Sequence, residues 1–413
     1  MCQPLLDELG FWFDYSCPYA FLARERLEGI EARHGVRIAY RPMLLGGVFR
    51  ARAVPQNLAG TLGPEKARHL ARDLARWCEA LGTSLTMPSG HPFRTVEALR
   101  ATLATGLDPA VVRGFFRAYW QEGRPPSDRA TVREVVTAAG HDGDAVLARL
   151  DDPAFKEDLR ARTEDAIARG IFGAPAWETP DGRIFWGQDR VDFALRALGR
   201  VIPGASPVPT SARRTSQMSR TLDFYWDFSS PYAYLGNAQA EALAARTGAE
   251  ITYRPMLLGA VFKAVGQDTI PMQSYSEAKR KYTLRDLHDW AAFLDVPFVF
   301  APKFPVASIK ALRVYLALPA ERQKAFRDAT FRAAWGEAKD ISDDAVLKEL
   351  IGDDADAILT KTNDPEIKQA LFAATDRAVA AGVFGAPAWV IDGTELFFGQ
   401  DRIPLVERAL LKA

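Results

Sequence analysis

The chain repeats itself once on the scale of a whole domain, and this repeat constrains the fold more than any other feature. Four separated blocks of the first half recur in the second half, displaced by 212 or 213 positions. The paired blocks begin at Phe11 and Phe224, at Tyr40 and Tyr253, at Phe172 and Phe384, and at Gly187 and Gly399. Such an offset indicates duplication of one whole domain, because a solenoid would repeat every 20 to 50 residues or so.

The duplication predicts two domains joined by a linker. We expect the first domain over residues 1–200 and the second over residues 222–413. The segment at 201–221 is rich in Pro, Ser, Thr and Arg and has no periodicity, so we interpret it as an exposed linker.

Composition places the chain among ordinary globular proteins. Hydrophobic residues make up 48%, charged residues 25%, and the formal net charge is zero. No basic run predicts a nucleic-acid partner, and no apolar stretch approaches the ~18 residues of a membrane span. The N-terminus lacks the pattern of a signal peptide, so we expect a cytoplasmic protein. Cys2, Cys17 and Cys78 form no CxxC pair, and no His-x-x-x-His pair occurs, so we expect neither a disulfide framework nor a zinc site.

The second copy shows the local pattern most clearly. Residues 222–228 and 251–253 read as strands on either side of a helix at 233–245, which favours a parallel β-α-β unit. Residues 388–391 and 395–398 read as a hairpin across Asp392-Gly393, followed by a helix at 403–411. Between these parts lies a helical insertion at about 268–381, matched by about 55–168 in the first copy. The predicted fold class is α/β, with two thioredoxin-like domains that each carry an all-helical insertion.

In this fold the first helix begins at the natural reactive position. Cys17 and Ser230 stand there in the two copies, each followed by a proline. Unpaired N–H groups and the helix dipole stabilise an anion at such a point, so we expect the pKa of Cys17 to be lowered. The alternatives are that Ser230 only caps its helix and that Cys17 only packs in the core.

Two further motifs recur around this position. Gly-Ala-Pro precedes the hairpin, and in thioredoxin-like folds a proline at this place is cis and lies opposite the reactive helix start. The residue before it then offers its backbone to an extended peptide, and glutathione is such a peptide. Gly-Gln-Asp-Arg follows the hairpin, and its aspartates, Asp189 and Asp401, either cap the last helix or hold the ammonium group of a γ-glutamyl end.

Together these motifs resemble the 2-hydroxychromene-2-carboxylate isomerases and the related kappa-class glutathione transferases of the DsbA-like group. The resemblance covers nearly all of each copy. It rests on the segment Asp227–Gly236, on Arg-Pro from Arg254, on Val-Phe-Gly-Ala-Pro from Val383, and on Phe-Gly-Gln-Asp-Arg from Phe398.

The resemblance implies a glutathione site. Ser230 would donate a hydrogen bond to the glutathione sulfur, and Ala386, beside Pro387, would pair with the cysteinyl backbone. The γ-glutamyl end would be held by Gln400 and Asp401, and a carboxylate by Lys279, with Gln267 a further match in a loop of different length. The corresponding residues of the first copy are Cys17, Ala174, Pro175, Gln188, Asp189, Lys66 and Asn57. For Lys279 and Lys66 a solvated charge on a helix face is the alternative.

The function implied is that of a glutathione-dependent isomerase, in which the glutathione thiolate adds reversibly to a conjugated carboxylate substrate of an aromatic-degradation pathway. A first alternative is a kappa-like transferase or peroxidase, or a monothiol glutathione-disulfide oxidoreductase that uses Cys17. Position 20 is alanine, so a local dithiol cycle is not available. A second alternative is that one copy is non-catalytic and serves as an interface partner. In either case we expect the copies to pack as an intramolecular pseudo-dimer.

Overall fold

The structure is a computed structural model that describes residues 7–27, 29–57, 59–200 and 220–412. Its internal contacts divide the chain into two compact units. Unit 1 comprises Met1–Leu62, Arg72–Pro209 and Ser276–Tyr282, and unit 2 comprises Gly63–Ala71, Thr210–Tyr275 and Thr283–Ala413. Most of the predicted linker, and Cys2, lie outside the described residues.

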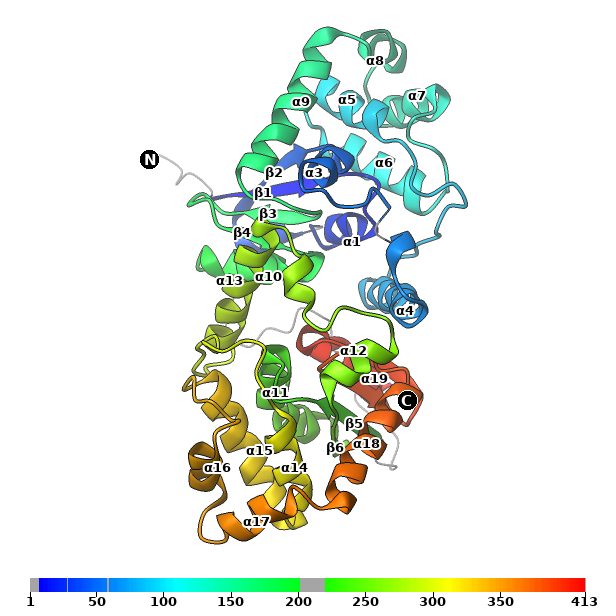
Figure 1. The fold of residues 1–413 in the computed structure, drawn as a ribbon. Helices are drawn as coiled ribbons and strands as arrows, with labels where there is room; N and C mark the ends of the chain where they lie inside the picture. Colours follow the sequence, from blue (N-terminus) through cyan, green and yellow to red (C-terminus); the bar gives the residue numbers. More distant parts are fainter. Residues whose placement is uncertain (1–6, 28, 58, 201–219, 413) are drawn as a thin grey trace. The chain divides into compact units, whose positions relative to one another are not determined.

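Unit 1 is built on a four-stranded mixed sheet in the order β2-β1-β3-β4. The strands are β1 (Asp7–Phe13), β2 (Val36–Pro42), β3 (Ala176–Glu178) and β4 (Ile184–Trp186). β1 runs parallel to β2 and antiparallel to β3, and β3 and β4 form a hairpin. The predicted β-α-β opening and β-β-α finish therefore meet in one sheet (Figure 1).

Unit 2 repeats this sheet in the order β6-β5-β7-β8. The strands are β5 (Thr221–Trp226), β6 (Glu250–Pro255), β7 (Ala388–Ile391) and β8 (Glu395–Phe398). The hairpin coincides with its predicted bounds. The turn spans residues 392–394, and its first two residues, Asp392 and Gly393, have φ of 47° and 69°, the left-handed conformation expected of Asp-Gly in a hairpin turn.

The helices of the first copy are α1 (Pro18–Leu27), α2 (Ile30–His34), α3 (Leu45–Ala51), α4 (Pro64–Leu81), α5 (Val96–Ala104), α6 (Pro109–Trp120), α7 (Arg129–Ala138), α8 (Gly143–Arg149), α9 (Pro153–Ala168) and α10 (Val191–Ala197). Short 3₁₀ helices η1 (Ala59–Thr61) and η2 (Gln188–Arg190) join them. Asp108 and Asp152 show why several of these helices start where they do: each side chain accepts a backbone N–H of the first turn, directly before a proline.

The helices of the second copy are α11 (Pro231–Thr247), α12 (Leu258–Ala264), α13 (Glu277–Phe293), α14 (Ile309–Ala317), α15 (Ala320–Trp335), α16 (Asp344–Ile351), α17 (Ala355–Lys361), α18 (Pro365–Ala380) and α19 (Ile403–Leu411), with η3 (Pro271–Ser274) and η4 (Gln400–Arg402). α17 lies within the predicted helical insertion, whereas α12 lies outside every helix predicted from the sequence. α12 has seven residues and no side-chain cap bond, so it lacks the signals that mark a helix in a sequence.

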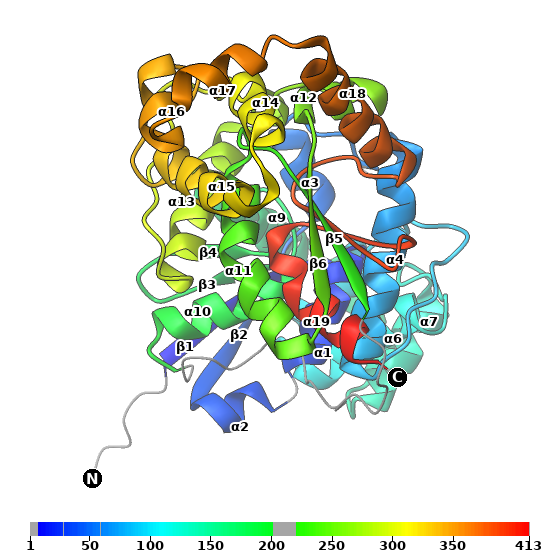
Figure 2. The same ribbon diagram turned by 90° about the horizontal axis from the view of Figure 1, so that it is seen from below.

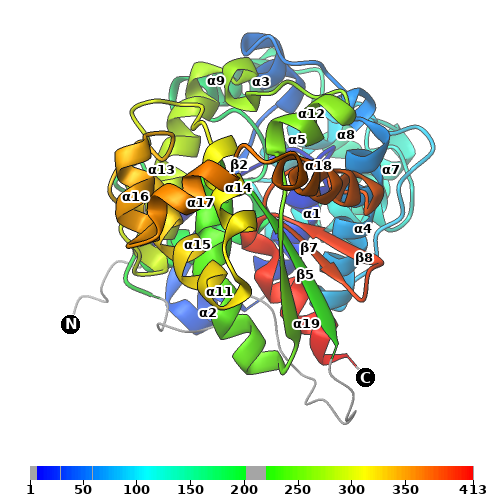
Figure 3. The same ribbon diagram turned by 60° about the horizontal axis from the view of Figure 1, so that its bottom comes forward.

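Opposite faces of the unit 2 sheet carry different helices. The ring of Phe224 lies against α11, where a Cβ on Gly236 would be 3.4 Å from it. The positive charge of Arg377, on α18, acts to lower the pKa of the next residue, Tyr225. Successive strand residues point to opposite faces, so α11 and α18 cover opposite sides. Figures 2 and 3 show α11 and α19 together on one side of these strands and α18 on the other.

The fold class expected from the sequence is therefore confirmed: each copy is a thioredoxin-like domain with a helical insertion. Among the residues that the structure describes, no helix is both long and apolar enough to cross a membrane. The same residues contain no group of three or more His, Cys, Asp or Glu side chains arranged to hold a metal ion.

Candidate active site

In the second copy, Ser230 and the Ala386-Pro387 peptide lie together. Ser230 is the N-cap residue of α11, where its Oγ accepts the N–H of Ala233 over 3.1 Å. The same Oγ donates a hydrogen bond to the carbonyl oxygen of Ala386 over 3.1 Å. The Ala386-Pro387 bond is cis, as the resemblance implies. Ser230 therefore caps the helix and at the same time faces the cis proline.

The first copy has the same geometry with sulfur in place of oxygen. The Cys17 Sγ donates a hydrogen bond to the carbonyl oxygen of Ala174 over 3.1 Å, and the Ala174-Pro175 bond is also cis. Burial raises the pKa of Cys17 to about 12, although backbone N–H groups of Ala20 and Tyr19 oppose the shift. The expected lowering of this pKa is therefore wrong for the thiol as it stands here. Desolvation of the charged form outweighs the helix start, and the carbonyl acceptor favours the S–H form.

A buried aspartate anchors the loop before each helix start. Asp227 is fully buried, and its two carboxylate oxygens accept the N–H groups of Ser229 over 2.9 Å and of Leu258 over 2.7 Å. Burial raises its pKa, while these bonds lower it. Asp14 binds Ser16 and Leu45 in the same way in the first copy. The sequence analysis gave these aspartates no role, although an acidic residue ending an apolar strand is the signal that could have found them.

A tryptophan of the insertion fixes the same loop from the other side. The Nε1 of Trp335 donates to the carbonyl oxygen of Phe228 over 2.8 Å, and Trp120 does the same to Tyr15 over 2.8 Å. The sequence analysis treated neither tryptophan as part of the site. Each holds a carbonyl two residues before the reactive position, so the insertion sets the shape of the reactive loop.

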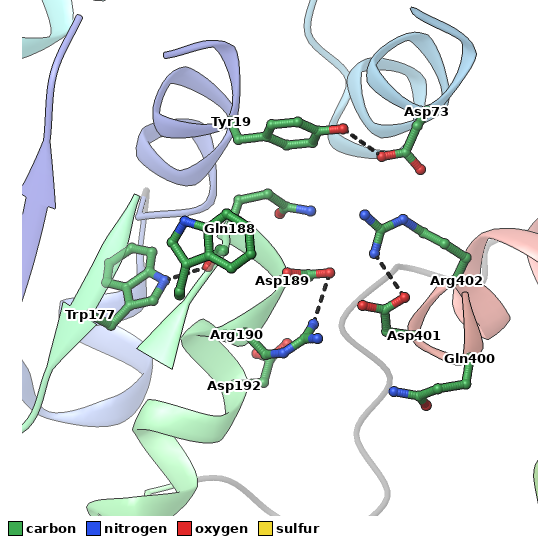
Figure 4. A network of polar contacts seen from close by, with 12 residues as sticks. Tyr19, Asp73, Trp177, Gln188, Asp189, Arg190, Asp192, Gln400, Asp401 and Arg402 are labelled. Atoms are coloured by element: carbon green, nitrogen blue, oxygen red, sulfur yellow. Dashed lines mark hydrogen bonds and ion pairs between the residues drawn. The ribbon is translucent and has the colours of Figure 1, made fainter. Parts of the chain in front are cut away.

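The Gln-Asp-Arg segment opens the last helix in each copy (Figure 4). Gln400 is buried, with its Oε1 accepting from Gln239 over 3.0 Å and its Nε2 without a hydrogen-bond partner. The Nε2 of Gln188 is likewise buried and without a partner. Two buried amide groups with an unused donor fit an acceptor-rich ligand, because an unpaired buried donor is costly.

The aspartates of this segment are ion-paired to the arginines that follow them. Asp189 lies 3.0 Å from Arg190 and Asp401 lies 3.2 Å from Arg402, and Figure 4 shows both pairs. The N-cap residues of α10 and α19 are these arginines, so each aspartate stands one position before the N-cap.

A glycine before each segment makes room for the aspartate. Gly187 and Gly399 have φ of 122° and 106°, and a Cβ there would lie 2.6 Å from Oδ1 of Asp189 or Asp401. The carbonyl oxygens of the two glycines accept the indole N–H of a core tryptophan, over 2.9 Å from Trp177 in the first copy and over 3.2 Å in the second. These positions therefore require glycine.

Lys279 and Lys66 do not belong to the units of the reactive residues with which the resemblance pairs them. Lys279 lies in the part of α13 that belongs to unit 1, with its Nζ 5.7 Å from the ring centroid of Trp186. Lys66 belongs to unit 2 and is exposed. Lys279 is thus not grouped with Ser230, nor Lys66 with Cys17.

The remaining predicted residues lie in loops. Asn57 is exposed, and its Oδ1 accepts the N–H of Gly60 over 3.1 Å. Gln267 is half-buried after α12, where its backbone N–H donates to Phe262 over 2.8 Å. Within the described part of the chain, these bonds do not reach the helix starts. Cys78 is buried in α4 with its pKa raised by burial to about 11, as expected of a packed thiol.

Comparisons with known proteins agree with this architecture. The DSBA-like thioredoxin domain matches the chain twice, over residues 8–199 and 221–411. The 2-hydroxychromene-2-carboxylate isomerase of Sphingobium xenophagum is 34% identical over 197 residues, covering 47% of this chain and 100% of the relative. The glutathione S-transferase kappa 1 of Caenorhabditis elegans is 30% identical over 207 residues, covering 45% and 88%. A solved structure of 2-hydroxychromene-2-carboxylate isomerase is 27% identical, covering 47% and 95%, with a TM-score of 0.41.

The resemblance found in the sequence is confirmed by these relatives, each of which matches about one copy. The chain belongs to the DSBA-like thioredoxin domain family, and it carries two copies of the family's domain in one polypeptide.

Proposed function

We propose that the chain is a glutathione-dependent isomerase of the 2-hydroxychromene-2-carboxylate type, with its working site in the second copy. The observation that carries this proposal is the contact of Ser230 Oγ with the carbonyl of Ala386, at a helix start and beside a cis proline. The curated relatives named as isomerases and kappa transferases support it from sequence.

The residues of the second copy suit a γ-glutamyl tripeptide. The unpartnered Nε2 of Gln400 is a buried donor that a ligand carboxylate or carbonyl would satisfy. Asp401 supplies the negative charge that an ammonium group needs. Ala386, next to Pro387, presents backbone groups to the cysteinyl part, as in strand addition. Gln267 remains a proposed contact for a carboxylate, whereas Lys279, which is grouped with unit 1, is left out of this set.

When bound, glutathione supplies the thiolate that adds to the conjugated double bond, permits rotation about the resulting single bond, and leaves again. Ser230 is built to stabilise that thiolate. Its Oγ accepts an N–H of α11, so the hydroxyl hydrogen is free to turn from the Ala386 carbonyl toward a sulfur. Accepting one hydrogen bond polarises the hydroxyl as a donor, and the helix dipole adds to the effect.

The surroundings of Cys17 give no support to the oxidoreductase alternative, because a thiol with a pKa of about 12 is almost wholly protonated at neutral pH. We propose instead that the first copy serves mainly as the structural partner in an intramolecular pseudo-dimer. The corresponding contacts to a tripeptide in the first copy would be Ala174, Pro175, Gln188, Asp189 and Asn57, without Lys66, which is grouped with unit 2.

The test compares two variants at matched positions. Turnover of an ortho-hydroxybenzylidenepyruvate is followed by absorbance with saturating glutathione, for Ser230→Ala and for Cys17→Ser. We expect Ser230→Ala to lower kcat by about 10²-fold, the scale for losing one preorganised donor, and Cys17→Ser to leave it within twofold. Full activity in Ser230→Ala together with loss in Cys17→Ser would place the working site in the first copy.

A further inference from the structure

The loop between α13 and α14 of unit 2 carries a cluster of aromatic rings around Trp335. Phe298 stacks on the indole at a centroid distance of 6.3 Å and an interplanar angle of 5°. Phe300 and Phe304 approach it at 5.8 and 6.4 Å with steep angles, and lie 5.1 Å from each other. Trp335 is fully buried, whereas the three phenylalanines are only half-buried. We call these three phenylalanines the aromatic wall.

The aromatic wall is tied to the reactive loop at both ends. Trp335 accepts the N–H of Val299 over 2.6 Å at its carbonyl and donates its indole N–H to Phe228, two residues before Ser230. The hydroxyl of Tyr234, in the first turns of α11, donates to the carbonyl of Pro297 over 2.7 Å.

At its far end the loop reaches Asp227, whose carboxylate accepts a hydrogen bond from the Ser308 side chain. The loop that carries the wall is therefore hydrogen-bonded at both ends to the loop and the helix that carry Ser230.

The rings are not needed to build the loop. The first copy places Leu85, Met87 and His91 at the three corresponding positions. It nevertheless keeps the bond from the N–H of Thr86 to the carbonyl of Trp120, at 2.7 Å, and the cis bond at His91-Pro92. The same backbone thus forms without any of the three phenyl rings.

The first copy is also more polar at this place. His91 Nδ1 lies 2.9 Å from the hydroxyl of Tyr119, and position 334, the counterpart of Tyr119, is alanine. The two copies therefore share a backbone and differ in the chemistry of this wall. Val299, between Phe298 and Phe300 in the chain, is 45% exposed, so the apolar surface of this loop continues to solvent.

We propose that the aromatic wall binds the aryl ring of the substrate and makes the second copy specific for planar aromatic carboxylates. This inference rests on the proposed function, since it concerns the substrate of the same site. Phe300 and Phe304 are half-buried and tilted at 45° to each other, so they offer ring edges and faces to another ring, which suits the offset and edge-to-face arrangements that aromatic pairs prefer. The first copy has Leu85, Met87 and His91 at the wall positions, and the phenyl ring of its loop, Phe93, lies 5.2 Å from Tyr119 instead, so we expect it not to share this specificity.

The experiment replaces the wall by the first copy's residues in the full chain, as Phe298→Leu/Phe300→Met/Phe304→His. Binding of trans-cinnamate is measured by calorimetry with saturating S-methylglutathione, and sorbate serves as the aliphatic carboxylate for comparison. We expect the Kd for cinnamate to rise at least tenfold, and the Kd values for sorbate and S-methylglutathione to change less than twofold. The matched control, Leu85→Phe/Met87→Phe/His91→Phe, should not weaken cinnamate binding.

Unchanged cinnamate affinity in the triple variant, or equal weakening of cinnamate and sorbate binding, would overturn the proposal that the wall binds the aryl ring. The rings would then serve another occupant, such as a protein partner. If the triple variant does not fold, Phe300→Leu alone should still raise the cinnamate Kd about threefold, and no change would overturn the wall. Failure of the wild-type chain to bind S-methylglutathione is a separate result, which would contradict the proposed function itself.

Discussion

The side chain of Ser230 and the carbonyl oxygen of Ala386, 156 residues apart in the chain, are joined by a 3.1 Å hydrogen bond. This contact brings the start of α11 against the cis peptide that opens the second hairpin. Cys17 and Ala174 repeat it at 3.1 Å in the first copy. One backbone thus presents an oxygen donor in one copy and a sulfur donor in the other.

The Cys17 thiol should react slowly at neutral pH, because it is buried and almost wholly protonated there. Because burial raises its pKa to about 12, the thiolate fraction grows about tenfold for each pH unit up to that pKa. In a Cys2→Ser/Cys78→Ser background, the alkylation rate by iodoacetamide should therefore keep rising from pH 7 to pH 10 without a plateau. A plateau below pH 9 would show an ordinary or lowered pKa and contradict the assignment.

Stability should depend on pH through the same group. Above about pH 8.5 the thiol of the unfolded chain loses its proton while the folded thiol keeps it, so folding stability falls as pH rises from there to the folded pKa. The loss is roughly 1.4 kcal/mol per pH unit. Denaturant unfolding at pH 8 and pH 9.5 should show this loss in the Cys2→Ser/Cys78→Ser chain, and a Cys17→Ala version should not show it. Parallel behaviour of the two proteins would refute the prediction.

Asp227 should matter for both folding and activity. Its carboxylate accepts the N–H groups of Ser229 and Leu258, and the amide of Asp227→Asn can accept with only one oxygen. We expect a loss of about 1–3 kcal/mol, the cost of an unsatisfied buried donor, together with reduced isomerase turnover. The matched control Asp14→Asn should cost similar stability with turnover within twofold. Equal losses of turnover in both variants would argue against a working site in the second copy.

Gly399 should be needed for ligand binding because its backbone positions Asp401. Its φ is 106° and a Cβ would lie 2.6 Å from Oδ1 of Asp401, so Gly399→Ala combines backbone strain with a displaced carboxylate. We expect glutathione affinity to fall about tenfold or more, by calorimetry, for loss of a charge-assisted bond.

Gly393→Ala is the control, since φ there is 69° and no atom lies within 4 Å of its Cβ. It should reduce stability by about 1 kcal/mol without changing glutathione affinity. Similar affinities for the two variants would remove Asp401 from the binding site.

The elements with local signals were predictable from the sequence. Asp392-Gly393 identified the hairpin, and Ser-Pro before an alanine-rich run identified the start of α11. The bond between Trp335 and Phe228 joins positions 107 apart, so only the tertiary fold shows it. The sequence predicts a lowered pKa for Cys17, but its pKa is raised. The sequence shows the helix start and does not show the burial that outweighs it. The same limit applies to the aromatic wall, since only the tertiary fold brings Phe298 and Phe304 beside Trp335.

The central claim is that Ser230 stabilises a glutathione thiolate, and the pKa of the bound thiol tests it most directly. Thiolate absorbance near 240 nm is titrated against pH for glutathione bound to the Cys17→Ala chain and to Cys17→Ala/Ser230→Ala. The account predicts a thiol pKa clearly below the ordinary value of about 8.5 with Ser230 present, and a rise of about one unit or more without it. An identical thiol pKa in the two proteins would contradict it.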